Sequence, residues 1–277
     1  MAPSLPPPLE IDPPLLNSAC PWATDLEDLK RLYACPHTGA VTTRTSLIRG
    51  FPHDDSVHQY ALFDAATHKV VASSSSSSSR PRPSGTGTAN ASLNTLGYSP
   101  HVLQTYLSFI RAIAADPDVP RAPGKTFIVS VTGSAEEVAR CYRLVAAEEE
   151  EARRRRDPGP PLAVELNLSC PNIPGSPPPA YDAAALRSYL AAVVAAAAAG
   201  EATSPPLPRI PFGLKTPPYT HPAQYDALVG ALLDCAGGAG GGVCPVSFLT
   251  ATNTLGSSLV LAGGDAPAPA LPGRGVG

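Results

Sequence analysis

The chain has 277 residues, of which 43% are hydrophobic, and its formal net charge is −3 at pH 7. This length suits a single (β/α)8 barrel of about 250 residues, with enough apolar material for a core. The lack of a basic surplus argues against a nucleic-acid binder, and no stretch approaches the roughly 20 apolar residues that span a bilayer. The N-terminus shows no basic start before an apolar run, so we expect a cytoplasmic protein without membrane association.

Short β-branched runs alternate with longer amphipathic runs along the chain. The predicted strands are Pro14–Ala19, Ala40–Arg44, Thr126–Val131, Leu162–Leu168, Ile210–Lys215 and Pro245–Thr250. The predicted helices are Asp25–Tyr33 with an N-cap at Thr24, Ser134–Glu151 with a near capping box, Asp182–Ala199 and Pro222–Cys235. This alternation favours an α/β fold with a parallel sheet. Six βα units are counted where a closed barrel needs eight, so we expect an incomplete TIM-type barrel.

We predict one domain over residues 1–277, interrupted by low-complexity sequence. An insertion at 65–90 contains a serine run, and the tail at 263–277 is rich in Gly, Pro and Ala with no strand signal. Four glutamates at 148–151 precede four arginines at 153–156, which gives Glu-to-Arg pairs at i,i+4. Such pairs are typical of a solvated helix end.

The six cysteines do not form a metal or disulfide pattern. They are scattered through the chain without a CxxC pair. A disulfide framework would be unusual in a chain of this size, so we expect most of them to be reduced, buried and apolar in character. Cys170 differs, because it lies in a polar segment that follows a predicted strand.

Polar residues gather just beyond the predicted strands, where parallel barrels carry their functional groups. Asparagine offers two donors and an acceptor without charge, which suits a planar, amide-rich ligand such as a pyrimidine or a flavin edge. Lys215 would lie over the core, where a cation could stabilise an anionic reduced flavin. The segments concerned are 17–20, 43–46, 167–172, 252–254 and, on a long connection, 94–97.

Two segments carry a resemblance to a known family. Glu165–Gly175 (ELNLSCPNIPG) resembles the active-site motif of the class 1 dihydroorotate dehydrogenases. Phe212–Tyr219 (FGLKTPPY) resembles the family's segment with the flavin-contacting lysine. Weaker matches occur in family order at 17–19, 39–44, 92–97 and 253–256. Both segments resemble in detail those of the homodimeric, fumarate-using class 1A. Cys170 also stands where class 2 has a serine.

The resemblance implies FMN-dependent oxidation of dihydroorotate to orotate in pyrimidine (UMP) biosynthesis, with fumarate as electron acceptor, in a homodimer. Cys170 would be the general base that takes the C5 proton, while hydride passes from C6 to N5 of FMN. The substrate would contact Arg44, Asn94, Leu96, Gly97, Asn167, Asn172, Asn253 and Thr254. FMN would contact Ser18, Ala19, Cys20, Arg44, Thr45, Asn167 and Lys215, and no metal is implied.

The chain departs from the family pattern at three places. Arg44 stands where class 1A usually has lysine, and Cys20 replaces a glycine that lets the backbone approach the flavin. The sequence ends with Gly273–Gly277, where the family's flavin-phosphate segments should begin. We therefore expect a truncated chain that binds FMN poorly. Two alternatives stay open: a sibling FMN barrel that acts on another pyrimidine or enone, and an inactive remnant.

Overall fold

The computed structural model forms two compact units. It describes residues 5–74, 89–155, 159–170, 178–237, 243–256, 258–262 and 268–271. The first unit comprises Met1–Phe51, Tyr98–Ser169 and Pro178–Asn253, and the second comprises Pro52–Gly97, Cys170–Pro177 and Thr254–Gly277. The assignment of the whole chain to one domain stays a prediction.

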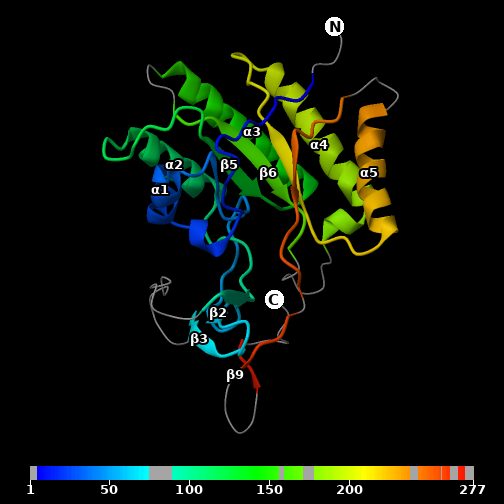
Figure 1. Ribbon diagram of the computed structural model, residues 1–277. Coiled ribbons are helices and arrows are strands. Elements are labelled where there is room, and N and C mark those ends of the chain that lie inside the picture. The colour runs from blue at the N-terminus through cyan, green and yellow to red at the C-terminus, as the bar shows by residue number, and fades with distance from the viewer. Residues whose placement is uncertain are drawn as a thin grey trace. The chain divides into compact units, whose positions relative to one another are not determined.

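The first unit is built on a parallel sheet with helices between its strands (Figure 1). In the described part of the chain this sheet has five strands in the order β1-β5-β6-β7-β8. They are β1 (Ala40–Thr42), β5 (Thr126–Val131), β6 (Leu162–Asn167), β7 (Phe212–Thr216) and β8 (Phe248–Ala251). The helices are α1 (Leu26–Ala34), α2 (Leu103–Ala115), α3 (Ala135–Arg154), α4 (Ala183–Glu201) and α5 (Pro222–Gly237). This arrangement confirms the predicted α/β class and fits an incomplete TIM-type barrel.

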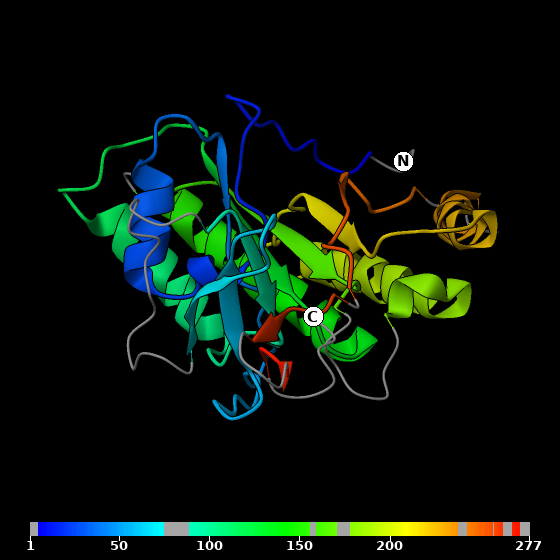
Figure 2. The same ribbon diagram turned by 60° about the horizontal axis from the view of Figure 1, so that its bottom comes forward.

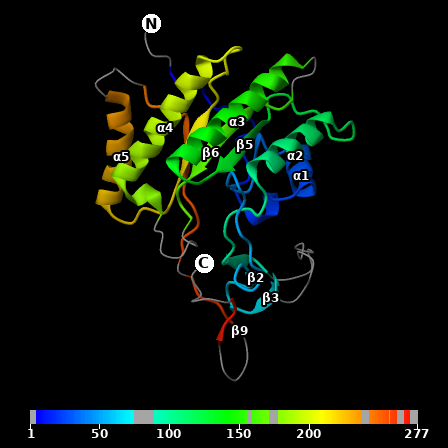
Figure 3. The ribbon, with the colours of Figure 1, turned by 180° about the vertical axis from the view of Figure 1, so that it is seen from behind.

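The helices cover one face of the sheet, as the view from behind shows (Figure 3). A large core cluster lies between the helices and the sheet. In this cluster the strand residues Phe127, Val164 and Leu214 pack with Leu107 and Val145 from the helices. The strands of this face read as near-continuous apolar runs, which is why β5 was predicted to the residue. The N-terminal segment runs on the other side of the sheet (Figure 2), where Leu9 and Ile11 pack on a small second cluster.

The predicted strand Pro14–Ala19 is wrong, and the count of strands falls from six to five for that reason. Within the described residues it is reduced to a single parallel bridge between Leu16 and Ala40. Prolines at 13 and 14 have no N–H to donate to a ladder. Beyond the bridge, the Asn17 side chain makes the hydrogen bonds that a paired strand would make. Its Oδ1 accepts from Thr42 N at 3.0 Å, and its Nδ2 donates to Thr42 O at 2.6 Å.

Two helix starts test the predicted caps. The capping box at the start of α3 is confirmed, since Glu137 N donates to Ser134 Oγ and Ser134 N donates to Glu137 Oε2. The predicted Thr24 cap of α1 is wrong. Asp25 is the N-cap and accepts from Asp28 N at 2.8 Å, while the Thr24 hydroxyl donates to Pro21 O.

Helix α2 was not predicted. Its N-cap position is Val102, which makes no side-chain cap, so the usual start signal is absent at this site. The helix is nevertheless fixed by burial on one face, with Leu103, Tyr106, Leu107 and Ile110 at helical spacing. Tertiary packing rather than a local signal specifies this element.

Helix α4 corrects the expectation that no segment could span a bilayer. It is 19 residues long, and an 18-residue window of it has a mean hydropathy of 1.5, which would allow a membrane span by length and composition. In the structure it packs between α3 and α5 and buries Leu186, Leu190 and Val193 against the core cluster. It serves here as a covering helix of the sheet, although alanine gives it an unusually apolar composition.

The charged end of α3 forms the three predicted pairs: Glu149–Arg153 at 3.0 Å, Glu150–Arg154 at 2.9 Å and Glu151–Arg155 at 3.2 Å. The prediction of a solvated helix end is wrong at the first of these pairs. Glu149 is only 7% exposed, and its Oε2 accepts from Leu162 N at 3.0 Å. It therefore joins the end of α3 to the start of β6.

The second unit contains two small antiparallel sheets in its described residues. One has the strand order β3-β2-β4, from β2 (Tyr60–Phe63), β3 (Val70–Ser73) and β4 (Ala91–Asn94). The other pairs β9 (Leu261–Ala262) with β10 (Ala268–Pro269). A small apolar cluster around Ala61, Leu93 and Val260 supports this unit. Strand β3 falls inside the segment predicted as an insertion, and β10 falls inside the predicted irregular tail.

Candidate active site

Side-chain alternation divides the strand residues of the first unit between two faces. On β6, Val164 belongs to the core cluster shared with the helices, whereas Ala163 belongs to the small cluster on the other side. Because successive side chains on a strand point to opposite faces, Glu165 and Asn167 lie on the side of Ala163. We call this side, which the helices do not cover, the inner face.

Strand register brings polar residues together on the inner face, near the carboxyl ends of the strands. Ser130 of β5 pairs with Glu165, and Asn167 pairs with Lys215 of β7, which pairs with Thr250 of β8. We call these five residues the inner-face polar set. Four of them are 6% exposed or less, and Thr250 is partly buried. Burying a polar group costs free energy unless the group is hydrogen-bonded. A concentration of such groups therefore identifies this edge of the sheet as a candidate site.

A chain of hydrogen bonds, which also includes Thr45, converges on Glu165 from both sides. Ser130 Oγ donates to Glu165 Oε1 at 2.8 Å, and Thr250 Oγ1 donates to Glu165 Oε2 at 2.7 Å. Since Ser130 has only one hydroxyl proton, its 2.9 Å bond to Thr45 Oγ1 must be donated by Thr45. Thr45 Oγ1 in turn accepts from Asn167 Nδ2 at 2.8 Å. Because the Glu165 carboxylate can only accept hydrogen bonds, it determines which atom is the donor in each bond of this chain.

This chain determines which way the Asn167 amide points. Its Nδ2 is committed to Thr45, and its Oδ1 accepts from both the backbone N and the Oγ of Ser169, at 3.1 and 2.6 Å. Asn253 continues the arrangement, since its Nδ2 donates to Ser169 O at 3.1 Å. In the described part of the chain, one amide N–H of Asn167 is left to donate to a ligand.

Lys215 is the buried cation of the site. It is 3% exposed, and its Nζ donates to Ser18 Oγ at 3.0 Å. Among the described residues its ammonium makes no ion pair. A buried ammonium with one hydroxyl partner is unfavourable in the protein alone, because most of its hydration has been lost without a compensating anion.

Two further predicted flavin contacts lie near this cation. The pKa of Cys20 is raised above its ordinary value, chiefly by burial, while the charges of Lys215 and Arg44 act in the opposite direction. The Cys20 side chain packs against the main core cluster. Arg44 is 5% exposed, and its Nη1 donates to Thr24 Oγ1. Ser18, Cys20, Arg44, Thr45, Asn167 and Lys215 therefore belong to one region of the first unit, with Ala19 between two of them.

The remaining predicted residues belong to the second unit. Asn94 ends β4, and its Oδ1 accepts from Leu96 N at 3.1 Å, with Gly97 next in the chain. Cys170 is partly exposed, and Thr254 is exposed. Asn172 lies outside the described residues. The functional roles of all these residues stay predictions.

Sequence reasoning missed Ser130, Glu165 and Thr250. A weak signal existed for Glu165, which stands two residues before Asn167 in an otherwise apolar strand and so shares its face. No local signal distinguishes Ser130 or Thr250. Their importance depends on the register between strands, which the sequence does not show.

The chain has relatives among known proteins, although no family model matches it. It is 30% identical over 172 residues to dihydroorotate dehydrogenase (fumarate) of Trypanosoma cruzi, which is 61% of this chain and 44% of the relative. The protein of the same name from Trypanosoma brucei brucei is 32% identical over 171 residues, and that of Saccharomyces cerevisiae is 28% identical over 171 residues, both with the same coverage. The matched part of the chain is therefore similar to proteins named dihydroorotate dehydrogenase (fumarate). This similarity confirms the resemblance to class 1A seen in the motifs. The chain spans about half the length of these dihydroorotate dehydrogenases, at 44%.

Proposed function

We propose that this chain carries the flavin-ring and substrate-ring side of a site that oxidises dihydroorotate to orotate with FMN, and with fumarate as the final acceptor. The observation that carries the proposal is Lys215, a buried ammonium on the inner face beside Asn167. The names of the relatives support the reaction and the acceptor.

The residues present fit a flavin ring. An isoalloxazine offers carbonyl oxygens and ring nitrogens along its pyrimidine end, where negative charge gathers on reduction. The Lys215 ammonium supplies the positive charge that this end requires, and Ser18 holds its Nζ in place. Thr45 and Asn167 add hydroxyl and amide groups beside it. FMN, when bound, supplies the hydride acceptor of the reaction.

Asn167 is suited to recognise a ring amide or carboxylate of the substrate. Its orientation is fixed by Thr45 and Ser169, so its remaining N–H is aimed before a ligand arrives. Preorganised donors of this kind need no rearrangement during the reaction. Glu165 contributes indirectly, because it orients the hydroxyls that orient Asn167.

Cys170 follows this fixed segment directly and is the proposed general base. It would take the C5 proton of dihydroorotate while the C6 hydrogen leaves as hydride. A thiol has an ordinary pKa near 8.5, so a thiolate can serve as a base close to neutral pH. Six reduced thiols, all within the described residues, fit a reducing compartment, and the proposal places the chain in the cytoplasm. Homodimerisation belongs to the same proposal.

The experiment is an assay of orotate formation by the 277-residue chain with FMN, dihydroorotate and fumarate. Cys170→Ala should lower the rate by about 10²- to 10⁴-fold and leave FMN binding unchanged. Cys170→Ser should retain slight activity that increases with pH, because a hydroxyl is a far weaker base than a thiol. Turnover of uracil-type substrates or enones, with none of dihydroorotate, would replace the proposed substrate. Normal turnover by Cys170→Ala would refute the proposed base.

A further inference from the structure

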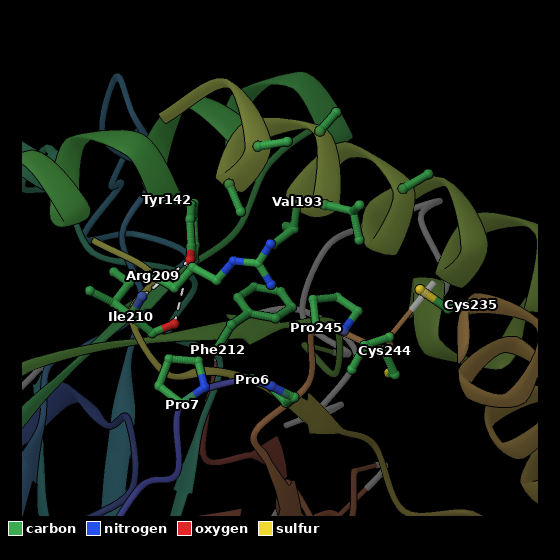
Figure 4. Close-up of a pocket in the computed structure, with 16 residues that line it drawn as sticks. Pro6, Pro7, Tyr142, Val193, Arg209, Ile210, Phe212, Cys235, Cys244 and Pro245 are labelled. Carbon is green, nitrogen blue, oxygen red and sulfur yellow. Dashed lines mark hydrogen bonds between the residues drawn. The ribbon is translucent and has the colours of Figure 1, made fainter. Parts of the chain in front are cut away.

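A second chemically distinctive place lies at the opposite end of the sheet from the polar set. A partly open cavity of about 430 Å³ is lined by the apolar side of α4, the start of β7 and the segment before β8 (Figure 4). Its lining is mostly aliphatic or aromatic, with Val193, Phe212 and Pro245 as examples. This volume is within the range of small-molecule sites in proteins.

The polar groups at the edge of the cavity have partners in the protein. The Tyr142 hydroxyl accepts from Ile210 N at 3.2 Å and donates to Ile210 O at 3.4 Å. Arg209 forms an ion pair with Glu201. The remaining reactive groups in the lining are two thiols, Cys235 and Cys244.

These two thiols are neighbours. Cys235 lies near the end of α5, and Cys244 directly precedes Pro245 on the way to β8. Figure 4 shows both at the same end of the cavity. Both residues are partly exposed, and Cys244 lies close enough to Cys235 to help raise its pKa. Two thiols at the same end of one cavity can form an S–S bond when side-chain rotation brings their sulfurs into contact.

We propose that Cys235 and Cys244 form a redox-active dithiol, which low-molecular-weight disulfides oxidise to an intramolecular disulfide in the wall of this cavity. The inference does not depend on the proposed dihydroorotate chemistry.

The reaction is two successive thiol–disulfide exchanges. One protein thiolate attacks a sulfur of oxidised glutathione, forms a mixed disulfide and releases one glutathione. The second protein thiolate then attacks the cysteine sulfur of the mixed disulfide, which forms the Cys235–Cys244 bond and releases the second glutathione. The protein loses two electrons and two protons, and the two glutathiones gain them.

The apolar surroundings set the pH range of this chemistry. Burial raises the pKa of Cys235, and the neighbouring Cys244 raises it further. The thiolate is the reactive form, so oxidation should be slow at pH 7 and accelerate about tenfold per pH unit while the pH is below the pKa.

The test is incubation of the native chain with oxidised glutathione, followed by alkylation, proteolysis and mass spectrometry. We expect a linked peptide pair containing Cys235 and Cys244 as the main disulfide. Cys244→Ser should leave Cys235 as a mixed disulfide with glutathione, and Cys235→Ser should do the converse. Cys35→Ser, another partly exposed cysteine, is the matched control and should not reduce the yield of the link.

Two results would overturn the proposal. One is persistence of both residues as separate mixed disulfides in the wild type. The other is a link that forms only after denaturation in urea, since the native geometry would then not be its cause. The circular-dichroism spectrum of each variant, measured alongside, confirms that the comparison is between folded proteins.

Discussion

The two faces of the central sheet use the same strands for different purposes. The face under the helices is a continuous apolar layer that includes Val129, Leu166 and Leu214. The inner face begins with the small apolar residues Ala40 and Ala163 and then changes to the inner-face polar set near the carboxyl ends of the strands. The first face maximises stability, whereas the second buries groups that cost free energy without a ligand. The buried inner-face polar set therefore indicates the candidate site more precisely than the fold class does.

The largest effect on stability is expected from the helix-covered face. Phe127 is fully buried and stacks on Tyr33 with ring centroids 5.2 Å apart. Phe127→Ala should lower the free energy of unfolding by about 3–5 kcal/mol, because the lost burial and the cavity both count. Val57→Ala, at a residue that is 47% exposed, is the control and should change it by less than about 0.5 kcal/mol. Urea denaturation measures both, and similar losses would mean that the core is not where we place it.

The next effect concerns the buried carboxylate of the inner face. Glu165→Ala removes the acceptor of two hydroxyls, Ser130 and Thr250, and should cost about 1–3 kcal/mol. Glu165→Gln keeps an acceptor oxygen and should cost less. Both variants should also weaken substrate binding through Asn167, as an increase in KM for dihydroorotate. If the alanine variant is as stable as the wild type, the hydrogen-bond chain does not exist as described.

A smaller contrast separates two adjacent glutamates at the end of α3. Glu149→Ala leaves the buried N–H of Leu162 without its acceptor and should cost about 1–3 kcal/mol. Glu150→Ala removes only an i,i+4 pair with Arg154 and should cost about 0.3–0.5 kcal/mol. Thermal melts of the two variants distinguish a structural carboxylate from a solvated one. Equal melting temperatures would restore the simpler prediction of a solvated helix end.

The sequence predicts the helix-covered face of the sheet better than the inner face. Strand β5 was located to the residue because apolar, β-branched residues are a local signal. Lys215 and Asn167 were found because polar residues at strand ends are conspicuous. Ser130 and Glu165 were missed because their role arises from register, and α2 because it has no capping side chain. Strand 14–19 was predicted wrongly, since a side chain, Asn17, makes the bonds that a backbone was expected to make.

The central claim is that Lys215 is kept buried for a ligand rather than for the fold. The most direct measurement compares Lys215→Met with the wild type, in urea unfolding without FMN and in an FMN titration. Lys30→Met is the control, because Lys30 lies near the surface and pairs with Asp116 at 2.8 Å. We predict that Lys215→Met raises the free energy of unfolding by about 1–4 kcal/mol, since a buried cation without an anion is replaced by an apolar chain. It should also weaken FMN binding about ten- to a hundredfold, through loss of a charged hydrogen bond. Lys30→Met should be only slightly less stable than the wild type, because exposed ion pairs contribute little, and should bind FMN normally. A Lys215→Met protein that is less stable than the wild type and binds FMN with unchanged affinity would contradict the account.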